Sequence, residues 1–138
     1  MRMITSLVLS ATLALSLGMT GPSQAASGLA NEQDINNGLL IAAIAEKIQR
    51  ECKSIGGRMF KARAYANGLK GVAEDRGYSM DEIEAYLDDS AEKKKMRERR
   101  NAYFKSKGAS NLDPDSLCVL GQREIASKSQ IGALLRAK

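Results

Sequence analysis

The sequence predicts an all-α fold: a small four-helix domain with one long, partly projecting third helix and one disulfide. Apolar residues recur at helical spacing in four segments, and signals that start or stop helices separate these segments. No stretch shows the alternation of apolar and polar residues that is typical of a half-buried strand.

The first two expected helices cover residues 34–52 and 58–76. The first has an apolar face that ends in a cysteine: Leu40, Ile41, Ile44, Ala45, Ile48 and Cys52. Gly56 and Gly57 then interrupt the helical pattern, because glycine loses the most conformational freedom in a helix. The second helix has an inward face of mostly small residues: Met59, Ala62, Tyr65, Ala66, Leu69, Val72 and Ala73. Gly77 ends it, at a position that favours left-handed backbone.

The third expected helix covers residues 80–107 and would be about 42 Å long if unbroken. Ser79 and Glu82 form a capping box at its start. Its apolar face meets only charged and polar residues beyond Ala91, so we expect it to leave the core there and to dock again, if at all, at Phe104. This arrangement would bury Ile83 and Leu87 and expose Lys94, Arg97, Glu98 and Asn101.

The fourth expected helix starts with Asp113 as N-cap and Pro114 as its first residue. Its inward face consists of Leu117, Leu120, Gly121 and Ile125. The tail, residues 129–138, either continues this helix or forms a short docking segment.

Residues 1–25 have the layout of a cleavable secretory signal peptide. Arg2 supplies a positive charge, residues 4–17 form an apolar run, and residues 23–25 carry small side chains where a signal peptidase cleaves. The run is shorter than the roughly 18 to 20 residues of a membrane-spanning helix, which disfavours the alternative of an uncleaved anchor. We therefore expect a single helical domain, residues 26–138, that is periplasmic or secreted and has no transmembrane segment.

Cys52 and Cys118 are the only cysteines of the chain. Because exported proteins meet an oxidising compartment, the pair predicts one structural disulfide. In the chain-entropy model this cross-link would contribute about 4 kcal/mol. The alternative is a redox-active pair, which is disfavoured because the cysteines form no Cys-x-x-Cys motif.

The chain contains no histidine. It therefore lacks the usual general base at neutral pH, the Ser-His and Cys-His nucleophile pairs, and the commonest zinc ligand. Asp88 and Asp89 would point about 100° apart on a helix, so they do not form a facing acid–base pair. A calcium loop around Asp113 lacks the central glycine and the closing glutamate. We therefore expect no enzyme activity, no cofactor and no metal site.

The basic second half of the third expected helix is the candidate partner-binding element of this chain, whose net charge is +5. The candidate residues are Lys93, Lys94, Arg97, Arg100 and Tyr103. A projecting basic helix would fit a protein with an acidic surface or anionic lipid head groups. The plainer alternative is a solvated face whose charges complement the helix dipole. Nucleic acid is not an expected partner, because no nucleic-acid fold signature is present.

Motifs along the chain carry a family resemblance. They include Asn37-Gly38-Leu39-Leu40, Tyr65-Ala66-Asn67-x-Leu69-Lys70, Gly77-Tyr78-Ser79, Leu117-Cys118-x-Leu120-Gly121 and Ser129-x-Ile131-Gly132. With these motifs the chain resembles a small family of exported helical alphaproteobacterial proteins of unknown function. The resemblance covers residues 34–138 and implies two matching cysteines but no catalytic residue. Some members are labelled as the thioredoxin-like component of NADH dehydrogenase, although the true component holds a two-iron cluster on four cysteines.

These observations favour an exported periplasmic protein that acts as a non-catalytic interaction or accessory module. The resemblance implies association with a respiratory NADH dehydrogenase complex. The alternative is a protein that binds a small molecule or anionic lipid head groups, which would need an apolar pocket between helices. An enzyme that uses carboxylates or thiols would need a cleft with convergent, perturbed groups.

Overall fold

The computed structural model describes residues 28–138, so the expected signal peptide lies outside the described residues. The elements are, in chain order, α2 (Gln33–Glu51), β1 (Ile55–Gly57), α3 (Met59–Asp75), α4 (Met80–Asp88), α5 (Ser90–Ser106), α6 (Pro114–Ala126), α7 (Gln130–Ala133) and β2 (Leu135–Ala137). This part of the chain is mostly helical, as the sequence predicts.

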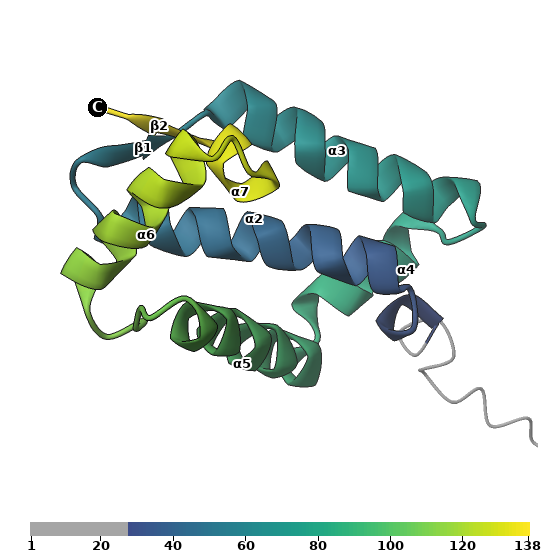
Figure 1. The fold of residues 1–138 in the computed structure, drawn as a ribbon. Helices are drawn as coiled ribbons and strands as arrows, with labels where there is room; N and C mark the ends of the chain where they lie inside the picture. Colours follow the sequence, from purple (N-terminus) through teal and green to yellow (C-terminus); the bar gives the residue numbers. More distant parts are fainter. Residues whose placement is uncertain (1–27) are drawn as a thin grey trace, which may run out of the picture.

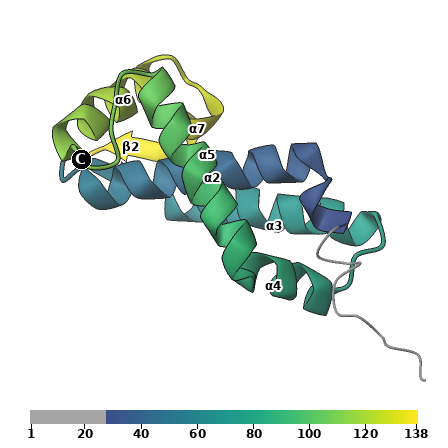
Figure 2. The same cartoon turned by 90° about the horizontal axis from the view of Figure 1, so that it is seen from below.

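Helix α2 lies at the centre of the fold. Helix α3 runs along one side of it and α5 along the other, while α6 crosses near its C-terminal end (Figure 1). Seen from below, α5 crosses α2 obliquely, and α4 lies at the end of the molecule opposite the strands (Figure 2). This placement explains why the long apolar face predicted for residues 34–52 is needed: α2 is covered from several directions.

The apolar interior consists of two clusters, one at each end of α2. The larger contains Ile44, Ile48, Cys52, Ile55, Phe104, Leu117, Leu120 and Leu135, among others. The smaller contains Leu29, Ile35, Ala73, Ile83 and Tyr86. In the larger cluster, a Cβ at Gly121 would lie 2.5 Å from Ile55 and 2.6 Å from Ile48. Glycine at this position therefore lets α6 approach α2 and β1 closely.

The description of the chain as purely helical needs one correction. Strands β1 and β2 form an antiparallel pair in which Gly56 lies opposite Arg136. The backbone N–H of Arg58 also donates to the carbonyl of Leu134 at 2.8 Å. Of the two alternatives for the tail, it is therefore the docking segment that forms. Strands of three residues are too short to show an alternating pattern in the sequence.

The prediction of one long third helix is wrong, because two helices occupy its range. Asp89 has an extended backbone (φ −62°, ψ 125°) that ends α4. Its carboxylate accepts a hydrogen bond from the backbone N–H of Glu92 at 2.9 Å and caps α5. An aspartate that caps a new helix satisfies the free N–H groups of that helix and stabilises the break.

Helix α5 does not project from the fold but packs against α2. Phe104 is fully buried, and Arg99 donates to the side-chain oxygen of Asn37 on α2 at 2.8 Å. The expected exposures are therefore only partly met. Ile83 is buried and Lys94, Arg97 and Glu98 are exposed as expected, whereas Asn101 is half-buried and Leu87 is 46% exposed.

Candidate functional site

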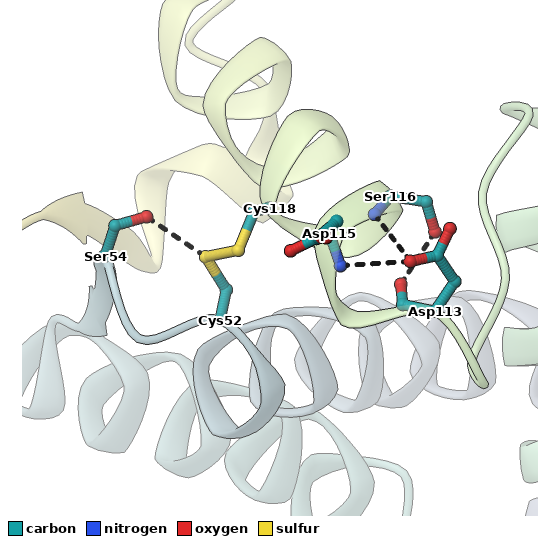
Figure 3. Close-up of a disulfide and its surroundings, with 6 residues drawn as sticks. All are labelled: Cys52, Ser54, Asp113, Asp115, Ser116 and Cys118. Carbon is teal, nitrogen blue, oxygen red and sulfur yellow. Dashed lines mark hydrogen bonds between the residues drawn. A yellow bond between two sulfur atoms is a disulfide. The ribbon is translucent and has the colours of Figure 1, made fainter.

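The predicted disulfide joins Cys52 to Cys118 (Figure 3), with their Cα atoms 5.1 Å apart and 66 residues between them in sequence. The Asp113 carboxylate caps α6 by accepting from the backbone N–H groups of Asp115 and Ser116, which fixes the turn that carries Cys118. Because Cys52 lies just before β1, the disulfide anchors the β1–β2 pair to α6.

The cations on the exposed side of α5 are largely paired with nearby acids. Lys93 bonds Asp88 at 3.1 Å, and Lys94 lies 3.9 Å from Glu98. Arg97 is exposed. The first three candidate partner-binding residues thus lie on the surface, but that surface carries charge of both signs.

The other two candidate residues, Arg100 and Tyr103, are half-buried in the packing around α5. Burial, followed by the nearby charge of Arg50, lowers the pKa of Arg100. The Tyr103 hydroxyl donates to the buried carboxylate of Glu124 on α6 at 2.5 Å. Burial and this hydrogen bond raise the pKa of Tyr103 above its usual range. The hydroxyl of Tyr103 is therefore used inside the fold and is not offered to a partner.

A second basic surface, which the sequence analysis missed, lies at the start of α3. We call it the α3-end surface, and it consists of Arg58, Met59, Phe60, Lys61 and Arg136, which together line a hollow of about 470 Å³. Phe60 is 90% exposed and Met59 is 66% exposed. The expectation that Met59 faces inward is wrong, because no helix covers the first turns of α3; within α3 only Ala73 is buried.

The cations of the α3-end surface have no acidic neighbours. The sequence contains no Asp or Glu from residue 52 to residue 73. Within residues 28–138, neither Arg58, Lys61 nor Arg136 forms an ion pair. At the far end of α3, by contrast, Arg76 bonds Asp34 at 2.9 Å, and this hydrogen bond lowers the pKa of Asp34 to about 2.

The charge at the start of α3 also opposes the helix itself. Arg58 occupies the N-cap position without a side-chain cap, and the first turn contains no acidic residue. A helix N-terminus favours anions and an Asp, Asn, Ser or Thr cap, so this arrangement does not stabilise the helix. Residues that break a local folding rule without compensation are typical of functional surfaces.

A third feature is an apolar groove between α2, α3 and α4, with a volume of about 270 Å³. Its floor is formed by the smaller apolar cluster, including Leu29, Ile35 and Ile83. Lys70 and Glu84 lie at its rim. An apolar pocket of this kind is what a small-molecule binder was expected to need.

The described part of the chain offers little for other chemistry. Among residues 28–138 there is no group of three or more Cys, Asp or Glu side chains that could hold a metal ion. In the same part, every helix is too short or too polar to cross a membrane.

No curated protein matches the chain, and no solved structure matches it either. The model of a family of unknown function matches residues 27–136, a range that includes both cysteines, the α3-end surface and the apolar groove. The chain belongs to this family of unknown function (DUF5333).

Proposed function

We propose that this protein is an exported, non-catalytic interaction module that docks an acidic partner protein through the α3-end surface. One observation carries the proposal. The highly exposed Phe60 and Met59 are framed by Arg58, Lys61 and Arg136, none of which has an ion pair within residues 28–138.

Covering these two side chains would supply the apolar part of the binding energy. Burying a phenylalanine or methionine side chain contributes about 1.5 to 3 kcal/mol each. Aromatic anchors surrounded by arginine are typical of interface hot spots, and the surrounding charge selects a partner of opposite sign. The hollow among these residues favours a partner protein with a protruding acidic side chain over a flat bilayer.

The cellular location and the identity of the partner are part of the proposal. A disulfide between Cys52 and Cys118 fits an oxidising compartment such as the periplasm. The resemblance to exported alphaproteobacterial proteins that are labelled as an NADH dehydrogenase component suggests a respiratory NADH dehydrogenase complex as the source of the partner. In that setting the chain would be an accessory protein on the periplasmic side.

The test compares two variants that remove three positive charges each. One carries Arg58→Gln, Lys61→Gln and Arg136→Gln on the α3-end surface, and the other carries Lys93→Gln, Lys94→Gln and Arg97→Gln on α5. The tagged proteins are used to capture partners from native membranes and periplasm, and N-terminal sequencing checks for cleavage before Ala26.

We expect the α3-end variant, but not the α5 variant, to lose a partner that the wild-type protein captures, and we expect this capture to weaken with salt. Equal capture by both variants would refute the assignment of the surface. Sedimentation with anionic vesicles that depends on the same three residues would instead indicate a membrane surface.

A further inference from the structure

The apolar groove is built to hold a group that makes no hydrogen bonds. Its floor residues Leu29, Ile35 and Ile83 are buried and aliphatic. The Tyr86 hydroxyl, the polar group of another lining residue, already donates to Asn36 at 2.5 Å. Because polar ligand atoms would lose their hydrogen bonds to water here without replacement, the bound part of a ligand must be apolar.

The groove is longer than its first hollow. A second hollow of about 350 Å³ lies between α2, α4 and α5, and both hollows are lined by Leu39, Tyr86 and Leu87. Met96 contributes to the far side. Leu87 stands at the junction and is 46% exposed, which is unusual for a leucine next to an apolar cluster. A long, narrow ligand could therefore lie along α2 and cover Leu87.

The rim of the groove on α3 supplies one positive group. Lys70 is exposed and forms no ion pair within residues 28–138. Glu84 faces the same hollow from α4, and Asn67 lies beside Lys70 on α3. At the other hollow Lys93 is already bonded to Asp88. An anionic head group is thus favoured at the α3 side, next to Lys70 and away from Glu84.

We propose that this groove binds a fatty acid, with its unbranched acyl chain on the apolar floor and its carboxylate beside Lys70. The site is separate from the α3-end surface, and neither proposal depends on the other.

The test measures affinity by calorimetry for hexanoate, octanoate, decanoate and dodecanoate below their micelle concentrations. Each methylene that enters the groove should tighten binding about fourfold, until the chain fills the available length and the gain stops. Ala66→Phe should block the groove, because Ala66 lines it from an exposed position on α3. Ala64→Phe is the matched control, since Ala64 is exposed on the same helix but does not line the groove.

The head group is tested with Lys70→Gln. This change should weaken dodecanoate binding by about two- to fivefold, the range of an exposed ion pair, and leave dodecanol binding unchanged. Lys61→Gln, which alters the α3-end surface, should affect neither ligand, so the two proposals fail separately. Absence of saturable binding, or equal losses from Ala66→Phe and Ala64→Phe, would overturn the fatty-acid site; an unchanged dodecanoate affinity in Lys70→Gln would overturn the placement of the carboxylate.

Discussion

Helices α3 and α5 are each 17 residues long and both pack against α2, and both are basic, yet the fold uses them differently. Helix α5 begins with a capping aspartate, its lysines bond nearby acids, and its Phe104 is fully buried. Helix α3 begins with Arg58 in place of a cap, its first cations have no ion pairs within residues 28–138, and its Phe60 is exposed.

This difference shows that the density of positive charge does not by itself identify a binding surface. The charges of α5 follow the helix dipole and pair locally, so the fold accounts for most of them. The charges at the start of α3 oppose the dipole and surround apolar side chains that nothing covers. The second arrangement is costly for an isolated domain, which is why it is the better candidate for contact with a partner.

The comparison is tested most strongly by the two phenylalanines. Phe104→Ala should lower the free energy of unfolding by about 3 to 5 kcal/mol, because it leaves a cavity in the larger apolar cluster. Phe60→Ala should change it by less than about 0.5 kcal/mol, because its ring is in solvent. Urea denaturation of both variants measures the difference. Similar losses would mean that Phe60 is covered in solution and that the α3-end surface is not free.

The disulfide should have the next largest effect, because it anchors the strand that leads into α3. Replacing Cys52 and Cys118 together by serine should cost about 2 to 4 kcal/mol of stability. Reducing agent should destabilise the wild-type protein by a similar amount and leave the double variant unchanged, as measured by thermal unfolding. A wild-type protein that is insensitive to reductant while its thiols are free would contradict a stabilising role of the bond.

The two helix starts should respond to substitution in opposite directions. Asp89→Ala removes the cap of α5 and should cost about 1 kcal/mol. Arg58→Ser adds a capping residue to α3 and should raise stability by about 0.5 to 1 kcal/mol while it weakens partner capture. Urea denaturation and the capture assay on the same samples test this. A variant that becomes less stable would show that Arg58 supports the fold.

The sequence was informative where a signal is local. The capping box of Ser79 and Glu82 is present in the structure, and the inward face ending at Cys52 is buried up to its disulfide. The break at Asp89 had a signal of the same kind, since Asp89 and Glu92 repeat the spacing of a cap and its third residue. Continuing one apolar face through that break assigned the wrong rotational phase to α5.

The sequence could not reveal what depends on the arrangement of distant elements. Helical spacing predicted an apolar face that includes Met59, but spacing does not show whether another element covers that face. The strand pair is equally non-local, because Gly56 and Arg136 meet only after the intervening helices have packed. The α3-end surface arises from both effects, which explains why it was missed, although the absence of acids between residues 52 and 73 could have indicated it.

The smallest expected effect concerns the residues that the sequence first singled out on α5. Replacing Lys94, Arg97 and Arg100 by glutamine should change stability by no more than about 0.5 kcal/mol, the usual range for surface positions. The Lys94–Glu98 pair is long and exposed, so its loss matters little, and the loss of Arg100 also relieves repulsion from Arg50. Partner capture and its salt dependence should stay at the wild-type level, whereas the matched triple change at Arg58, Lys61 and Arg136 abolishes capture. If the α5 change weakens capture more than the α3 change, paired charges on α5 form the interface after all, and the distinction drawn between the two helices is wrong.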